Sequence, residues 1–197
     1  DWHYVPYERQ GLPFKAMDAD QRDAAHALLR TSLSEAGYSK AQNIILLESI
    51  LAEMENDPDH RDHEKYYLCI FGTPSSTGTW AWRFEGHHLS MNFTIIDGKV
   101  TYPTPSFLGA NPGLVVGGTH DGLRALADEE DIARKLVLAL DDTQRSQAIA
   151  SSKPPRDILT REQKKVKLPA DDAYTGGIPL SALTPDQTAI FWDLVSL

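Results

Sequence analysis

The chain has 197 residues, a formal net charge of −9 and 41% hydrophobic residues, which suits one globular domain with its own core. It contains no run of about 18 apolar residues that would cross a membrane, and its acidic excess disfavours nucleic acid and anionic membranes as partners. The single cysteine, Cys69, excludes an intramolecular disulfide and a zinc site built from several cysteines. We therefore expect a soluble protein, either cytoplasmic or exported with its signal removed.

The first third of the chain predicts two helices. An N-cap at Asp18 with Gln21 three residues later has the pattern of a capping box, and Gly37 is placed to end this helix. The second helix is expected from about 40 to 54, because apolar residues recur there at helical spacing: Ile44, Leu47, Ile50, Leu51 and Met54. The polar stretch 56–64 that follows is interpreted as a solvated loop, with its two histidines outside any ligand cluster.

Beyond residue 65 the spacing of apolar residues changes to alternation. This predicts strands near 66–72, 79–85, 88–96 and 99–107. Asp97-Gly98 is a type I′ hairpin signal, and Gly86-His87 fits a type II′ turn with glycine first. The sequence therefore predicts an antiparallel sheet built from consecutive hairpins.

The two turns also predict which residues oppose each other. With a Gly86-His87 turn, Glu85 lies opposite His88, and the expected apolar pairs are Phe84–Leu89, Trp82–Met91 and Trp80–Phe93. The Asp97-Gly98 turn adds the pairs Ile95–Val100 and Phe93–Tyr102. Both assignments place the apolar side chains on one face and the polar ones on the other.

The last part of the chain is predicted to form helices separated by loops. A Gly- and Pro-rich loop is expected at 108–122, helices at about 128–140 and 142–150, and a mobile loop near 153–180. Thr184-Pro185 begins a last helix, with threonine as N-cap and proline at the first helical position. Three segments repeat an apolar residue, a cap and a glutamine, which we interpret as recurrent capping: 17–22, 140–145 and 183–188.

These elements predict an α+β fold in a single domain, residues 1–197. An antiparallel sheet of about four strands, within 66–107, is expected to pack on its apolar face against the flanking helices.

The polar face of the predicted sheet gathers several chemically reactive side chains: Arg83, Glu85, His88, Ser90, Asn92 and Thr94. A solvent-exposed sheet face without any function would also be polar, so this simpler interpretation stays open. The mixture of a guanidinium, a carboxylate, an imidazole, a hydroxyl and an amide beside a Gly-rich loop is typical of oriented recognition or acid–base chemistry.

Several roles follow for these residues. Glu85, His87 and His88 are candidate ligands of a divalent metal ion, or an acid–base group in which Glu85 and His88 act together. Arg83 would hold an anionic group of the substrate. Three further residues are candidate ligand-binding residues: Ser90, Asn92 and, in the Gly-rich loop, Asn111. A structural role for the two histidines in the hairpin is the remaining alternative.

Four segments carry a resemblance to a known family: Trp2–Pro6, Trp82–Phe93, Phe107–Pro112 and Glu129–Ala133. They resemble the bacterial family catalogued as domain of unknown function 3500, most specifically through Glu85-Gly86-His87-His88-Leu89-Ser90. The resemblance implies a longer protein with a carboxy-terminal His-x-His motif followed by Trp-Arg-Asp, which this chain does not contain. If a family metal site uses that motif, the chain holds half of the ligands.

The leading functional hypothesis is a metal-assisted hydrolase of unknown substrate that works through the polar face around Glu85–His88. The alternative is a non-catalytic module that binds a small ligand or a partner through the same face. Because the resemblance implies a missing carboxy-terminal region, self-association or binding of a carboxy-terminal fragment is also expected.

Overall fold

The computed structural model describes residues 2–163, 165 and 177–197, and it divides into two compact units. One unit spans Trp2–Leu126 and the other runs from Ala127 to Leu197. Helices and an open antiparallel sheet confirm the predicted α+β class. None of the helices in the described ranges is long and apolar enough to cross a membrane. Part of the expected mobile loop near 153–180 lies outside the described residues.

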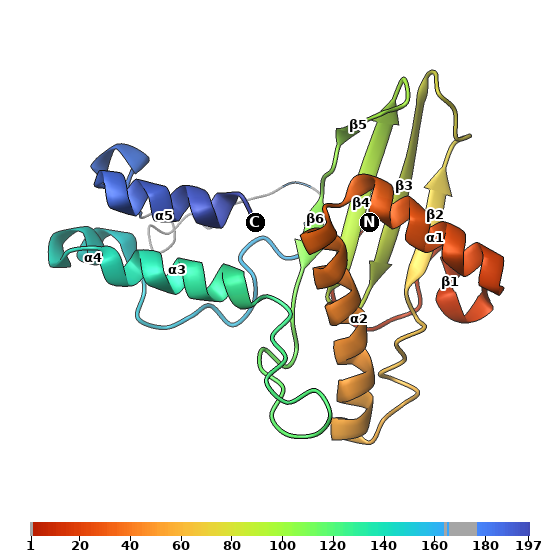
Figure 1. Ribbon diagram of the computed structural model, residues 1–197, viewed down its shortest axis with the longest axis horizontal. Coiled ribbons are helices and arrows are strands. Elements are labelled where there is room, and N and C mark those ends of the chain that lie inside the picture. Colours follow the sequence, from red (N-terminus) through yellow and green to blue (C-terminus); the bar gives the residue numbers. More distant parts are fainter. Residues whose placement is uncertain (1, 164, 166–176) are drawn as a thin grey trace. The chain divides into compact units, whose positions relative to one another are not determined.

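The first unit is built on one antiparallel sheet (Figure 1). Its strands run in the order β1–β2–β3–β4–β5, and β6 also pairs with β4. The strands are β1 (Leu12–Pro13), β2 (Tyr67–Phe71), β3 (Thr79–Gly86), β4 (Leu89–Ile96), β5 (Lys99–Tyr102) and β6 (Ser106–Leu108). The expected single strand 99–107 is therefore two strands, because the prolines at 103 and 105 lack the amide hydrogen that a continuous ladder needs.

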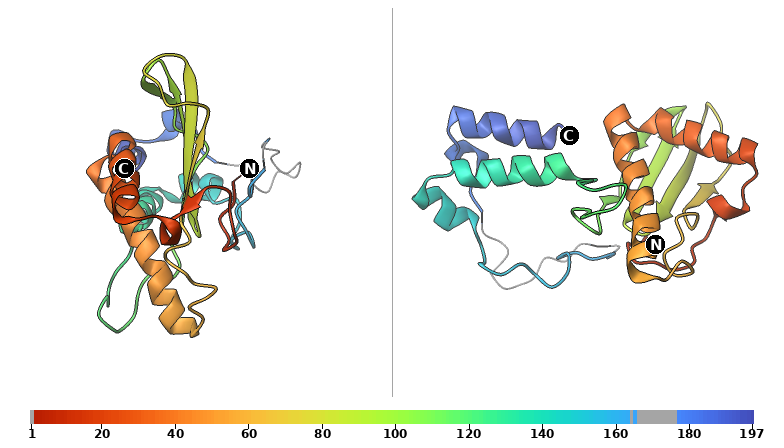
Figure 2. Two further views of the ribbon diagram at one scale, coloured as in Figure 1. Left: turned by 90° about the vertical axis from the view of Figure 1, so that its right-hand side faces the viewer. Right: turned by 60° about the horizontal axis from the view of Figure 1, so that its bottom comes forward.

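Two helices cover one face of this sheet, while the amino-terminal residues lie on the other side (Figure 2). Helix α1 (Ala19–Ser32) begins with the predicted capping box of Asp18 and Gln21, and α2 spans Glu35–Glu55. The expectation that Gly37 ends the first helix is wrong. The Ser34 side chain accepts a hydrogen bond from the Gly37 amide, so it caps a new helix that contains Gly37 in its first turn.

The β3–β4 hairpin has the predicted faces but a different register. Glu85 lies opposite Ser90 and Trp82 opposite Phe93, so His87-His88, and not Gly86-His87, forms the turn. His88 adopts a φ of 58°, whereas Gly86 stays in the strand, where a Cβ would overlap the Tyr66 ring. Because the shift is two residues, every side chain keeps its predicted face.

The β4–β5 hairpin follows the prediction at its turn. Asp97 and Gly98 both have positive φ, 49° and 74°, and Ile95 lies opposite Val100 as expected. The expected Phe93–Tyr102 pair is wrong, because a bulge between Thr94 and Ile95 places Tyr102 opposite Thr94.

The core of the first unit lies between the helices and the apolar sheet face. Trp82 stacks on Phe93 with ring centroids 4.4 Å apart, and both side chains are buried. The helices add apolar side chains at helical spacing: Ala25 and Leu29 from α1, and Ala41, Ile44 and Leu47 from α2. This packing fixes the sheet and leaves its second face to the amino-terminal segment.

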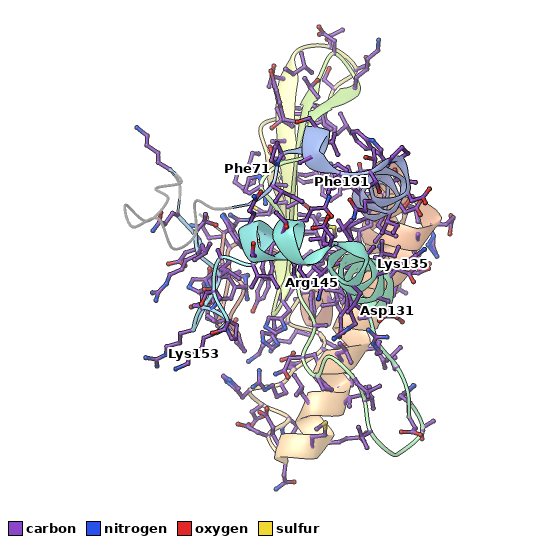
Figure 3. The ribbon with its side chains drawn as sticks, turned by 90° about the vertical axis from the view of Figure 1, so that its left-hand side faces the viewer. Phe71, Asp131, Lys135, Arg145, Lys153 and Phe191 are labelled. Atoms are coloured by element: carbon purple, nitrogen blue, oxygen red, sulfur yellow. The ribbon has the colours of Figure 1, made fainter. Side chains whose placement is uncertain are left out.

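In the described residues of the second unit, the α-helices are α3 (Ala127–Ala139), α4 (Asp142–Ala148) and α5 (Pro185–Val195) (Figure 3). Their positions confirm the three predicted carboxy-terminal helices. Capping boxes start α4, with Asp141 and Gln144, and α5, with Thr184 and Gln187. The amides of Gln144 and Gln187 also bond to each other in both directions, at 2.9 and 2.8 Å.

Candidate functional site

The amino-terminal segment covers the polar sheet face. The face is therefore not exposed to solvent, which excludes the simpler of the two interpretations given above. The amino-terminal segment, residues 2–9, is attached to this face through backbone, hydroxyl and ring contacts. The His88 amide donates to the Tyr4 carbonyl at 2.9 Å, and the Tyr67 hydroxyl donates to Glu8 at 2.6 Å. The Tyr4 ring also packs on Phe107. Beneath the segment, the side chains of Arg83, Glu85 and Ser90 are buried.

Glu85 is a buried carboxylate between two guanidinium groups. Its oxygens lie 3.0 Å from Arg83 Nε and 3.8 Å from Arg9 Nε. Arg9 also donates to the carbonyls of three residues of the amino-terminal segment: His3, Val5 and Tyr7. Burial raises the pKa of Glu85, and the two arginines oppose that shift. This geometry holds the amino-terminal segment on the sheet.

The other predicted residues of this face bond mainly to the protein itself. Ser90 Oγ lies 3.5 Å from a Glu85 oxygen, and Asn92 donates to the Pro105 carbonyl at 2.8 Å. Asn111 lies exposed in the loop after β6 and, among the described residues, makes no side-chain hydrogen bond to the other predicted site residues. The face is thus a polar interior in this structure.

The expected direct pairing of Glu85 with His88 is wrong, because the shifted register places Ser90 opposite Glu85. His88 lies in the turn, where its backbone carbonyl accepts from the Gly109 amide at 2.8 Å. Its ring stacks on that of His87 with centroids 4.0 Å apart. Burial, together with the neighbouring His87, lowers the pKa of His88 to about 4.

His87 has a partner that the sequence analysis missed. Its Nδ1 forms a short hydrogen bond with Oε2 of Glu48, which comes from α2 and is buried. The backbone carbonyl of His87 accepts from the buried Tyr66 hydroxyl at 2.9 Å, and the Tyr66 ring packs against Gly86. A signal for Glu48 existed: it lies four residues after Ile44 and three before Leu51, so it is a carboxylate on the apolar side of the helix.

The Glu48–His87 pair forms part of the wall of a pocket of about 190 Å³. Its lining consists of Pro6 and ten residues with titratable side chains: Tyr7, Glu8, Arg9, Glu48, Asp59, His60, Asp62, Lys65, Tyr66 and His87. The loop 56–64, interpreted from the sequence as a solvated loop, contributes three of them. Polar groups from α2, two loops and the amino-terminal segment therefore converge on one small cavity.

A metal site does not form from the predicted ligands. Within residues 2–163, 165 and 177–197, no three His, Cys, Asp or Glu side chains are grouped so that they could hold a metal ion. Glu85 is bonded to arginine and His87 to Glu48, so Glu85, His87 and His88 are not brought together as the expected ligand set.

Comparison with known proteins gives a family and no activity. The whole chain, residues 1–197, matches the family described as "Protein of unknown function (DUF3500)", and the chain belongs to that family. No curated protein matches the chain. No solved structure matches it either.

Proposed function

We propose that the protein is a hydrolase in which His87, oriented by Glu48, acts as the general base in the pocket. The observation that carries this proposal is the buried carboxylate–imidazole pair at the wall of a polar cavity. Such a pair is the arrangement by which enzymes fix one tautomer of a catalytic histidine. The proposal keeps His87 from the predicted site and puts a Glu48–His87 pair in place of the predicted Glu85–His88 pair.

The chemistry follows from the two ring nitrogens. With its proton on Nδ1, held by the Glu48 carboxylate, neutral His87 presents a lone pair on Nε2. That nitrogen can take a proton from water as the water oxygen attacks an acyl carbon, and the same proton then passes to the leaving group. The described lining contains no serine, threonine or cysteine, and the proposal takes water as the nucleophile. General-base catalysis of this kind contributes about 10²–10⁴ in rate.

The turn that carries His87 is well supported for this role. Tyr66 holds its carbonyl, the His88 ring lies against its ring, and Glu48 holds Nδ1. A catalytic group has to be held close to its productive geometry, and packing around the turn provides that support.

A non-catalytic small-ligand module is the second candidate, since the same pocket could bind a molecule without transforming it. The two candidates differ in what His87 must do. A binding module needs the shape and hydrogen bonds of the pocket, whereas the hydrolase needs a proton acceptor at Nε2.

The test uses a panel of p-nitrophenyl esters and p-nitroanilides with short neutral, cationic and anionic acyl groups. We expect His87→Gly to lower hydrolysis by about 10²–10⁴, with added imidazole restoring part of the rate, and Glu48→Gln to lower it by a smaller factor. His63→Gln, in the exposed part of the 56–64 loop and outside the pocket lining, is the control. A folded His87→Gly protein with an unchanged rate would refute the proposal. Binding without turnover of any of the panel would support the module.

A further inference from the structure

We infer that the pocket takes a small molecule that carries a primary ammonium group. This inference rests on the proposed function, because it names the substrate class of the same site. Three features of the pocket support it: its unoccupied hydrogen-bond acceptors, its balance of charge and its size.

Two buried polar side chains of the lining, Glu48 and His87, present free acceptors. Glu48 uses Oε2 to bind His87, and no described residue hydrogen bonds to its Oε1. When the proton of neutral His87 lies on Nδ1, its Nε2 is an acceptor too, and within the described part of the chain it has no partner. Glu48 is 3% exposed and His87 8%. A donor group of the ligand can bind Glu48 Oε1, which leaves His87 Nε2 for the attacking water.

The charges of the lining favour a cation. Four carboxylates face two permanent cations: Glu8, Glu48, Asp59 and Asp62 against Arg9 and Lys65. Both cations are engaged, since Arg9 binds backbone carbonyls and lies beside Glu85, while Lys65 pairs with Glu8 at 3.3 Å. Asp62 pairs with Lys15, outside the lining, at 3.2 Å, whereas among the described residues the Asp59 carboxylate has no ion-pair partner. An anion would meet surplus negative charge, whereas an ammonium group supplies three donors and a positive charge.

The volume limits the rest of the ligand. The pocket, at about 190 Å³, is smaller than the roughly 300–1,000 Å³ typical of pockets that enclose drug-sized molecules. Pro6 and the rings of Tyr7 and Tyr66 provide the apolar part of the lining. The ligand is then an ammonium group on a short chain, with its hydrolysable bond within reach of His87.

The experiment compares three probes of nearly equal size by NMR titration of the full chain: ethylammonium, ethanol and acetate. We expect ethylammonium to bind at least ten times more tightly than ethanol, with acetate weaker still. Glu48→Gln and Asp59→Asn should each reduce the preference for ethylammonium severalfold. Glu53→Gln, on the exposed side of α2 and outside this pocket, should leave it unchanged. The Asp59→Asn variant keeps the test decisive if Glu48→Gln does not fold, because Asp59 is exposed.

The outcomes separate this inference from the proposed function. Ethylammonium that binds no more tightly than ethanol, or equally well to all three variants, overturns the ammonium inference even if hydrolysis depends on His87. Selective, Glu48-dependent binding upholds it. If such binding occurs while His87→Gly hydrolyses the ester panel as fast as the parent protein, the hydrolase fails and the ligand class stands.

Discussion

Acidification should destabilise the first unit through His88, because this side chain is held neutral inside the fold. Its pKa is lowered from 6.5 to about 4, with burial as the main cause. A histidine whose folded pKa is lowered contributes stability above its unfolded pKa. That contribution is lost as the pH falls from 6.5 toward 4.

The size of the effect follows from the two pKa values. Proton linkage gives a loss of about 2 kcal/mol between pH 8 and pH 5, and about 3 kcal/mol once His88 is protonated in both states. His88 is only partly buried, so solvent screening makes these figures the upper end of the range. We therefore expect a loss of about 1–2 kcal/mol at pH 5 that is specific to His88.

The assay is urea denaturation at pH 8 and pH 5 of the parent protein and of His88→Asn. Asparagine accepts the positive φ of 58° at this position and does not titrate in this range. Other groups respond to pH in both proteins, so the difference between their pH dependences isolates His88. If both proteins lose the same stability, or if the His88 ring protons titrate near pH 6.5 by NMR, the reasoning is wrong.

Three further predictions concern stability, each measured by urea or thermal denaturation. Glu85→Gln should cost about 3–5 kcal/mol, because it removes a buried negative charge that lies beside two arginines; a loss below 1 kcal/mol would contradict the buried ion cluster. Gly86→Ala should cost about 1–3 kcal/mol through overlap with the Tyr66 ring, whereas Gly113→Ala, where a Cβ has open space, should be close to neutral. Trp82→Ala should cost about 3–5 kcal/mol through the core cavity that it leaves, and a mild effect would show that the apolar face is loosely packed.

The sheet could be predicted from the sequence as far as its faces, because alternation is a local property of each strand. The register of the β3–β4 hairpin could not be predicted, because it depends on which two residues form the turn. Gly86 has the residue type of a turn position, yet its missing side chain serves the Tyr66 ring, twenty positions earlier in the chain. His88, with a φ of 58°, occupies the turn position expected for a glycine, because Gly86 is needed in the strand beside the Tyr66 ring.

The boundary between α1 and α2 and the candidate site were also only partly predictable from the sequence. Ser34 caps α2, whereas the sequence analysis interpreted Gly37, three residues later, as the end of the preceding helix. His87 was among the predicted residues, whereas Glu48 was missed because its role arises from contact with a turn 39 positions away. The amino-terminal cover of the polar face is likewise a long-range contact that no periodicity encodes.

The mutual amide bonds of Gln144 and Gln187 make the two helix starts depend on each other. Each amide oxygen also accepts its own N-cap amide, and each NH₂ group also donates to a backbone carbonyl, of Ala182 or Ala139. Both side chains thus have every donor and acceptor in use, so glutamate at either position would lose two donors at once. We therefore expect a replacement at either glutamine to weaken the first turns of both α4 and α5.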